Sequence, residues 1–459
     1  MHFRAKPDFE KDYDLGRSFF FYFLLMVEEK DLTIMKYIRT YETEEKFLTD
    51  KDSTSRGFRL KPTLYKYSEA EDHVHLELDD PRKHGDSTYI EITLDSDVEF
   101  SFYIGNTPGD TQTTMNCSID WGDGTVETKT ITKDDKGFKL SHNYTAGSYK
   151  IELYGVEREY GIPGDVSKSL ISHLSNVKRV VLGSDVVSIG GYAFEDCFDL
   201  TSIYIPESVT SINLCAFWKC TSLTSVYIPE SVTSIEYGAF ANCFDLTSIH
   251  IPERVTSIGG SAFTNCSSLT SIYIPERVTS IESSAFTSCT SLTSINIPER
   301  VTSIESSVFA GCTSLTSINI PEGVTSIGPG AFSNCSSLKS INIPEGVTSI
   351  NGFSGCTGLT SINIPEGVTS IKSDAFSGCT GLTSIRIPER VTTIGAWAFD
   401  GCTSLTSISS FNTTAPTLNN SVFQGLPTNG ILHIKPGATG YDVWLKFFLP
   451  SGWTIIEDL

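Results

Sequence analysis

"LTSINIPERVTSIESSVFAGCTS", residues 292–314, is followed without a gap by "LTSINIPEGVTSIGPGAFSNCSS", residues 315–337. The second stretch repeats the first with few changes, and the same 23-residue unit recurs on both sides of the pair. Self-similarity at a fixed period of this length is typical of a solenoid, in which each repeat forms one coil that stacks on the next. The structure of one unit therefore decides the fold of this whole region.

Two residue types mark the repeat most clearly, a cysteine near the end of each unit and a proline near its start. The cysteine spacing is 23 residues except for one step of 21, where "SINGFSGC" has lost two residues, and the proline spacing shortens at the same place. A shared period with a shared deletion means that both residues belong to one structural unit. The cysteines are Cys197, Cys220, Cys243, Cys266, Cys289, Cys312, Cys335, Cys356, Cys379 and Cys402, and the prolines run from Pro206 to Pro388.

Within a unit, the pattern L-T-S-I-x-I-P-E-x-V-T-S-I-x-x-x-A-F-x-x-C predicts two extended segments and a tight turn. The S-I-x-I stretch alternates polar and apolar residues, which predicts a strand whose isoleucines point inward and whose residue x points outward. Proline ends this strand because it has no N–H for the sheet. V-T-S-I supplies a second extended segment, and A-F-x-x-C predicts a helical or 3₁₀ turn. One unit cannot bury its apolar groups alone, so we expect about ten 23-residue coils stacked into a parallel sheet.

The unit resembles the BspA-like (Treponema-type) leucine-rich repeat, in which isoleucine replaces several of the leucines. The resemblance assigns residues 176–410 to the solenoid, and residues 411–459 look like the capping repeat that closes such arrays. In this last segment "ILHIKPG" follows the same pattern as "SINIPEG". We expect its aromatic residues to cover the open edge of the final coil, since an uncovered sheet edge promotes aggregation. These residues are Tyr441, Trp444, Phe447 and Trp453.

Residues 88–155, ahead of the solenoid, contain short strand-like segments separated by turn residues. In "DWGDGT", residues 120–125, Asp-Gly lies between two such segments, which is a strong hairpin signal. This motif and the later "HNYTAGSY", residues 142–149, resemble PKD-type domains, which implies an immunoglobulin-like β-sandwich that serves as a spacer. The fold class predicted for the whole chain is mostly β, with this sandwich preceding the solenoid. The matching residues are Trp121, Gly122, Asp123, Gly124, Thr125, His142, Tyr144, Gly147 and Tyr149.

Two segments near the N-terminus are less informative. Residues 156–175 are expected to link the sandwich to the solenoid and to cap the first coil with a short helix. Residues 1–87 match no known pattern, and we expect either a further small β-rich domain or an attachment segment.

The composition limits the classes of partner. The 459 residues carry a formal net charge of -21, which opposes binding to nucleic acid or to anionic lipid. The longest apolar run, "SFFFYFLLMV" at residues 18–27, is about half as long as a membrane-spanning helix needs to be. It lacks the positive flank and small-residue cleavage site of an export signal, so we interpret it as a buried strand or helix. Cationic or neutral partners such as glycans or protein surfaces remain open, and so does the oligomeric state.

We find no pattern that indicates catalysis, and we expect neither a cofactor nor a bound metal. The periodic cysteines occupy equivalent places in their coils, so their side chains run parallel. Metal ligands and disulfide partners must instead point toward one another, so we expect these cysteines to be buried free thiols. Cys117 and Cys215 lie outside this column with no evident partner. His73 and His75 are more simply an exposed strand face than metal ligands. Asp120 and Asp123 have the composition of a calcium site, although capping of the turn explains them more simply.

The positions that vary between repeats point to binding. The outward strand position, residue x, is aromatic in the first half of the array and an amide in the second. A neighbouring column carries arginines, and aromatic side chains beside arginine on a concave sheet are typical of a recognition surface. The alternative is that the rings and amides only stabilise the stack. The outward column is Val181, Tyr204, Tyr227, His250, Tyr273, Asn296, Asn319, Asn342, Asn363 and Arg386, and the predicted ligand-binding strip is Tyr204, Tyr227, His250 and Tyr273 with Arg254, Arg277 and Arg300.

These observations predict a non-enzymatic binding or adhesion protein. The resemblance implies a bacterial protein at the cell surface or secreted, which presents a concave face to a host protein, a glycan or a neighbouring cell. One alternative is a phage or virion protein that uses the same modules for receptor binding or decoration, attached through residues 1–87. A carbohydrate-active enzyme hidden in the first 87 residues is the remaining alternative, and it lacks a recognisable acid/base pair.

Overall fold

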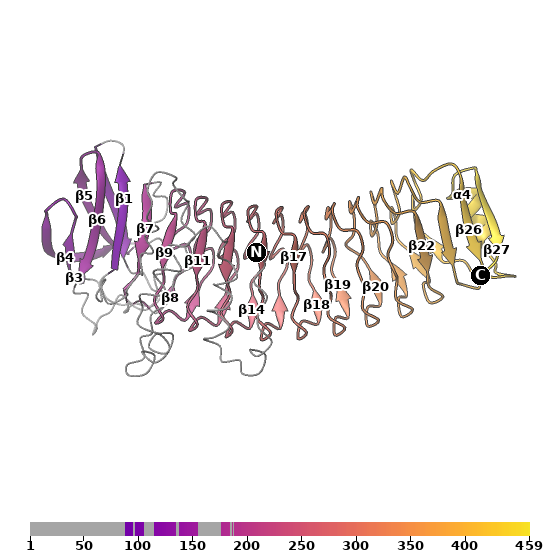
Figure 1. The fold of residues 1–459 in the computed structure, drawn as a ribbon, viewed down its shortest axis with the longest axis horizontal. Helices are drawn as coiled ribbons and strands as arrows, with labels where there is room; N and C mark the ends of the chain where they lie inside the picture. Colours follow the sequence, from indigo (N-terminus) through magenta and orange to yellow (C-terminus); the bar gives the residue numbers. More distant parts are fainter. Residues whose placement is uncertain are drawn as a thin grey trace, which may run out of the picture. The chain divides into compact units, whose positions relative to one another are not determined.

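The computed structural model describes residues 88–94, 97–104, 114–134, 137–154, 176–183, 186 and 188–459. These residues form short β-strands with one α-helix near the C-terminus, as Figure 1 shows. The mostly β class is therefore confirmed for this part of the chain. The predictions for residues 1–87 and 156–175, which include those for His73 and His75, lie outside the described residues.

The six strands before the solenoid pair antiparallel, in the order β2-β5-β4-β3-β6-β1. Because side chains alternate across a strand, β1 buries Ile90, Ile92 and Leu94 on one side, where they pack with Trp121 and Ile151. β4 and β5 are joined by two residue pairs next to their connection, Lys133↔Phe138 and Asp134↔Gly137. The strands are β1 (Thr88–Leu94), β2 (Val98–Ile104), β3 (Thr114–Asp120), β4 (Val126–Asp134), β5 (Gly137–Tyr144) and β6 (Gly147–Tyr154).

The first strand of the solenoid is shared between the two regions. β7 (Val177–Val181) pairs antiparallel with β1, with Ile90 opposite Val180, and parallel with β9 (Ser202–Tyr204) on its other side. The first coil therefore does not expose a free sheet edge here, because β1 occupies the place of a preceding coil. Sequence periodicity carries no sign of this pairing, since it joins segments of different repeat character.

The repeats form two columns of short parallel strands, as predicted from S-I-x-I and V-T-S-I. In each column, a residue pairs with the equivalent residue of the next coil, for example Ser225 with Ser248 and Ser234 with Ser257. The first column continues with β11 (Ser225–Tyr227), β13 (Ser248–His250), β15 (Ser271–Ile272), β17 (Ser294–Ile295), β22 (Ser384–Ile387), β24 (Ser407–Ser410) and β26 (Gly430–Ile434). The second contains β8 (Ser188–Ile189), β10 (Ser211–Ile212), β12 (Ser234–Ile235), β14 (Ser257–Ile258), β16 (Ser280–Ile281), β18 (Ser303–Ile304), β19 (Ser326–Ile327), β20 (Ser349–Ile350), β21 (Ser370–Ile371), β23 (Thr393–Ile394) and β25 (Thr417–Leu418).

The core is built from identical residues stacked along the solenoid axis. Phenylalanines of successive A-F-x-x-C turns stack from Phe194 to Phe423, with ring centroids 5.1–5.8 Å apart. Each ring is buried, and burying a phenylalanine contributes about 1.5–3 kcal/mol. From Cys220 onward, each buried thiol of the column donates to a phenylalanine carbonyl of the preceding coil, at 3.1–3.2 Å.

The ring column also gives the number of coils. Eleven phenylalanines stack in sequence, and Trp444 continues the column at 5.5 Å from Phe423. The solenoid thus has about twelve turns, two more than predicted. The last two were predicted as a capping repeat and not counted, because both lack the cysteine, and the proline is absent from the first and one residue late, as Pro436, in the second. Both keep an aromatic ring at the stacking position.

The A-F-x-x-C turns require left-handed backbone at two positions of most coils. One lies just before the Ala and the other just before the Cys, and φ there is between 52° and 93° in residues that include Tyr192, Cys215, Lys219 and Trp397. A left-handed conformation costs a residue with a Cβ about 1–2 kcal/mol, so glycine and asparagine are favoured there. The turn itself therefore does not favour large side chains at these positions.

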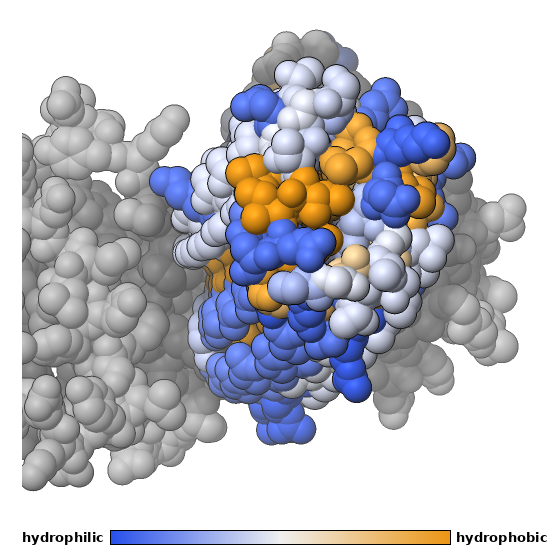
Figure 2. Space-filling model, turned by 90° about the vertical axis from the view of Figure 1, so that its right-hand side faces the viewer, coloured by the Kyte–Doolittle hydropathy of each residue, from blue (hydrophilic) through white to orange (hydrophobic). Residues whose placement is uncertain are grey.

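The C-terminal end is closed by helix α4 (Tyr441–Phe447) and by β27 (Trp453–Glu457), which pairs parallel with β26. Tyr441, Trp444 and Trp453 are buried, in agreement with their predicted packing on the last coil. Phe447 is 66% exposed, so its predicted role in covering the coil is wrong. Helical periodicity explains this, because Tyr441 and Trp444 face the core while Val443 and Phe447 lie on the outer side. Figure 2 looks onto this end, where hydrophobic surface is bordered by hydrophilic residues.

Candidate binding strip on the first strand column

The aromatic residues of the predicted strip lie on consecutive coils. Tyr227 and His250 are paired in register between β11 and β13, and their rings stack at 6.1 Å with an angle of 6° between the planes. Tyr204 is in register with Val181 of the first coil. Tyr227 and His250 thus form a stacked pair at the outward position of the S-I-x-I strand, and Tyr204 and Tyr273 hold the equivalent position in the flanking coils.

His250 also contacts the column of glutamates that follows the prolines. Its Nε2 lies 3.2 Å from Oε1 of Glu230 in the preceding coil. Both side chains are largely exposed, and exposed ion pairs contribute little to stability. The contact fixes the orientation of the imidazole ring, and we assign it no larger role.

Tyr273 is the most exposed ring of the strip, at 51%. Partial desolvation raises the pKa of its phenol, and the negative charges of Glu253 and Glu276 and a hydrogen bond to Glu253 act in the same direction. The hydroxyl therefore stays protonated at neutral pH and donates a hydrogen bond. A ring with a free face and a fixed polar tip is suited to contact a ligand.

The three arginines of the strip lie in the turns beside these rings. Arg254, Arg277 and Arg300 are exposed, and each follows an exposed glutamate. Within the described part of the chain, none of the three guanidinium groups lies within 4.0 Å of a carboxylate. Glutamates further along do pair between coils, as in Arg386–Glu366 at 2.6 Å and Lys435–Glu389 at 3.3 Å. The three arginines are thus available to a ligand.

The asparagines of the second half follow the same outward column. Asn296 and Asn319 form a parallel β-bridge, and both side chains are exposed. Among the described residues, no hydrogen bond joins the amides of this column, so the alternative in which the amides stabilise the stack gains no support from side-chain hydrogen bonds. Instead, Asn265 donates from Nδ2 to Oδ1 of Asn242 at 2.8 Å, in the A-F-x-x-C turns. That the strip lies on a concave face and binds a ligand stays a prediction.

The cysteine column has the properties expected of structural thiols. All ten members are buried and free, and burial raises the pKa of the nine from Cys220 to Cys402, to about 12 for Cys312 and Cys379. Among the described residues, no group of three or more His, Cys, Asp or Glu side chains is arranged to hold a metal ion. Cys215, for which we predicted no partner, lies beside Tyr192 and shares a hydrogen bond with it. The side chain of Cys117 lies outside the described residues.

The turn between β3 and β4 gathers the residues that resemble the PKD-type motif. Trp121 is buried and stacks on His142 at 4.9 Å, and the Tyr144 hydroxyl donates to the Trp121 carbonyl at 2.8 Å. Asp120 and Asp123 accept the amides of Gly122 and Thr125 respectively, at 2.9 and 2.8 Å. The two carboxylates thus cap the turn.

Among the described residues, no helix is long and apolar enough to cross a bilayer.

Comparison with known proteins identifies the repeat. A model of the BspA type leucine rich repeat region matches residues 165–270, 233–352 and 351–431, which together make up more than half of the chain. No curated protein sequence matches the chain.

Several solved structures are similar to this chain. It is 31% identical to a leucine rich cell surface protein from Faecalibacterium prausnitzii A2-165, over 56% of this chain and 84% of that one, with a TM-score of 0.39. It is 27% identical to a leucine-rich repeat protein from Bacteroides ovatus, over 61% and 94% of the two chains, with a TM-score of 0.34. It is 32% identical to the leucine rich repeat protein of T. pallidum, over 39% and 80%, with a TM-score of 0.33.

Proposed function

The chain belongs to the BspA-type leucine-rich repeat family, and from this premise we propose that it is a non-enzymatic binding protein that uses the strip on its first strand column. The family supports a protein-binding role in general terms. The glycan as an alternative ligand rests on the stacked rings of the strip, because flat aromatic faces also pack well on sugar rings. Nothing in the described residues or in the comparisons indicates catalysis.

One observation carries the proposal for the strip. Tyr227 and His250 stack in register on adjacent coils, and Tyr273 extends the column with half of its surface exposed. Aromatic rings beside arginines are the side chains that dominate binding energy in protein interfaces. The equivalent positions of later coils hold asparagine, so the fold does not require rings there. This comparison within one chain favours a ligand over a purely structural role.

The segment β1–β6 is proposed to act as an immunoglobulin-like spacer. The cluster of Trp121, His142 and Tyr144 supports this assignment, because the residues of the PKD-type motif pack on one another around the turn. A location at the cell surface or outside the cell is part of the same proposal and follows from the family. The virion alternative has no support from the comparisons.

The proposal is tested with arrays of glycans and of purified extracellular-matrix proteins. In the strip variant, Tyr227→Asn, His250→Asn and Tyr273→Asn introduce the residue that later coils hold at the same position, so the coils are expected to stay folded. A matched control changes the same column further along, with Asn319→Ala and Asn342→Ala.

We expect the strip variant to lose binding to the array ligands of the wild-type protein by at least tenfold, while the control variant keeps it. Circular dichroism and thermal melting establish that both variants are folded. Equal binding by the wild-type protein and the folded strip variant contradicts the proposed role of the strip.

A further inference from the structure

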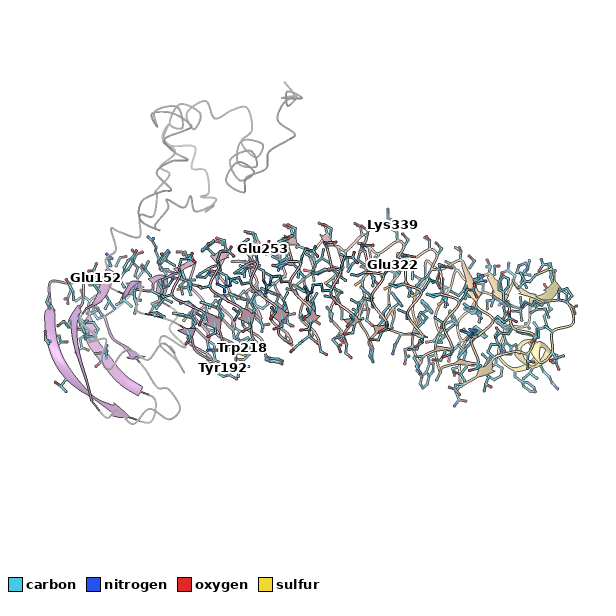
Figure 3. The ribbon with its side chains drawn as sticks, turned by 90° about the horizontal axis from the view of Figure 1, so that it is seen from below. Glu152, Tyr192, Trp218, Glu253, Glu322 and Lys339 are labelled. Carbon is cyan, nitrogen blue, oxygen red and sulfur yellow. The ribbon has the colours of Figure 1, made fainter. Side chains whose placement is uncertain are left out.

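A second surface of the solenoid departs from the repeat in the same way as the strip. It lies at the A-F-x-x-C turns, on the edge away from the glutamate column, and Figure 3 shows Tyr192 and Trp218 together on this edge with Glu253 and Glu322 on the opposite one. From residue 260 to residue 378, the outward positions of this turn hold Gly, Ala, Ser, Thr, Asn, Pro or Asp, apart from Glu282, Glu305 and Lys372 at its first position. The fold is therefore satisfied by small or short polar side chains at these positions.

The first three coils carry large side chains instead. Tyr192 and Cys215 occupy the left-handed position before the Ala, with φ of 62° and 52°. Leu214 and Tyr237 precede that position in the second and third coils, and Trp218 follows the stacked phenylalanine of the second. Because a Cβ at a left-handed position is unfavourable, the turn alone does not select Tyr192. We call Tyr192, Leu214, Trp218 and Tyr237 the corner patch.

The members of the corner patch are held together by contacts between coils. The Tyr192 N–H donates to the Leu214 carbonyl at 2.9 Å, and the Cys215 N–H donates to the Tyr237 carbonyl at 2.8 Å. The Tyr192 hydroxyl and the Cys215 thiol share a hydrogen bond. These contacts place the side chains on one surface with fixed backbone spacing.

Trp218 is fixed by a cation and a carboxylate. The Lys219 ammonium lies over the Trp218 ring, 4.1 Å from its centroid, and also lies 3.4 Å from Oδ1 of Asp196. A ring held in this way is preorganised, which lowers the entropic cost of binding through it.

The patch is open to solvent at its second and third coils. Tyr237 is 54% exposed and Leu214 is 39% exposed, and Phe198 and Phe244 are exposed further along the same turns. In the middle coils, Ser and Thr take the places of these phenylalanines. Exposed apolar and aromatic side chains rimmed by polar groups are typical of protein interaction sites.

The rim of the patch is acidic. The turns of these three coils, residues 190–200, 213–222 and 236–246, contain five carboxylates and one lysine. That lysine, Lys219, is paired with Asp196, and Lys178 from outside the turns pairs with Asp199 at 3.0 Å, so the carboxylates still outnumber the basic groups by five to two. Basic groups on a partner are therefore favoured, and complementary charge at a rim mainly increases the rate and specificity of association. The five acidic residues are Glu195, Asp196, Asp199, Glu236 and Asp245.

We propose that the corner patch is a second binding site, separate from the strip, for a protein segment that presents apolar side chains flanked by lysine or arginine. Its apolar part seats on Leu214, Trp218 and Tyr237, and its basic residues meet the carboxylates of the rim. The site is limited to the first three coils, because the following turns lack both the rings and most of the acidic residues.

The test uses the full chain and a phage-displayed library of random 12-residue peptides as the probe. In the corner variant, Leu214→Ser, Trp218→Thr and Tyr237→Ser introduce residues that the middle coils hold at the same positions. Trp397→Ser is the matched control, because Trp397 is also exposed and has a left-handed backbone, while the equivalent positions of the neighbouring coils hold Asp374 and Ser421 rather than rings. A charge variant, Glu236→Gln with Asp245→Asn, is compared with Glu322→Gln and Glu345→Gln on the opposite edge, which change the net charge equally.

We expect selection to enrich peptides that combine apolar residues with Lys or Arg. These peptides should bind the corner variant at least tenfold more weakly than the wild-type protein, bind Trp397→Ser equally well, and lose more affinity in the charge variant than in its control. Equal binding by the wild-type protein and the folded corner variant overturns the proposal, and so does a charge variant that behaves like its control. Oxidation of Tyr237 by hydroxyl radicals in the free full chain should be high. If Tyr237 is protected in the free chain, the chain itself covers the patch and a separate partner is excluded.

Discussion

Truncation of one central ring tests whether the phenylalanine column holds the solenoid together. Phe286 is fully buried and stacks on Phe263 at 5.4 Å and on Phe309 at 5.8 Å. Replacement of a buried phenylalanine by alanine costs about 3–5 kcal/mol, through lost burial and the cavity that remains. The lost stacking with two neighbours, worth about 0.5–1.5 kcal/mol each, is part of this sum. For a protein whose net stability is about 5–15 kcal/mol, Phe286→Ala should remove about a fifth of it or more.

The assay is urea unfolding followed by circular dichroism and by tryptophan fluorescence. Trp218 reports on the coils before Phe286, and Trp397 and Trp444 report on those after it. Each coil of a solenoid contacts only its neighbours, so a defect in the middle should lower the urea concentration at the unfolding midpoint. It should also split unfolding into two transitions, one for the coils before Phe286 and one for the coils after it. Tyr273→Ala is the control, since it removes a ring of similar size that is half exposed. The reasoning is refuted if Phe286→Ala and Tyr273→Ala lower the stability equally.

Two further predictions concern the titratable groups. Burial raises the pKa of the nine column thiols that follow Cys197, so a thiol reagent at about pH 8 should modify none of these nine in the native protein and all of them after unfolding. Rapid labelling of native Cys289 would show that the column opens. The hydrogen bond from His142 is the main reason why the pKa of Asp123 is lowered from 3.8, so its stabilising contribution is complete above the unfolded-state pKa and is lost as the pH falls from about 4 through the folded value. Asp123→Asn should therefore flatten the acid side of the stability profile measured by thermal melting, and an unchanged profile would mean that the His142 contact does not stabilise the fold.

The periodic part of the fold was predictable because the same residues are buried in every coil. Ile, Phe and Cys at fixed offsets fix which side chains face inward, and the two-residue deletion in "SINGFSGC" showed that the offsets move together. The last two coils were not counted because they lack the periodic cysteine, although they keep a stacked ring, Phe423 or Trp444, and other buried apolar residues. The β1–β7 pairing escaped for a different reason, since it joins two segments without a shared period and depends on backbone hydrogen bonds that any sequence can make.

The candidate sites, too, were predictable from the sequence only in part. Variation at the outward strand position drew attention to Tyr227 and Tyr273, because the strand pattern already gives the direction of that side chain. The variation at Tyr192, Leu214 and Tyr237 was equally visible, but its meaning depends on the left-handed backbone of the turn, which a periodic pattern does not reveal. The cost of a large residue at such a position becomes apparent only with the φ angle.

A repeat array supplies its own comparison, since the coils that hold the simplest residues show what the fold needs. By this measure, both sets of departures, the rings of the strip and the corner patch, lie in the coils before residue 300, while the coils from Gly323 to Gly367 hold Asn at the strand position and small residues at the turn. A purely structural reason for the rings would apply to every coil alike, because all coils share the same core and the same hydrogen-bonded neighbours. The rings of the strip and the corner patch are grouped in one half of the array, whereas Trp397 stands alone at a later turn, and this grouping supports the two proposed binding sites.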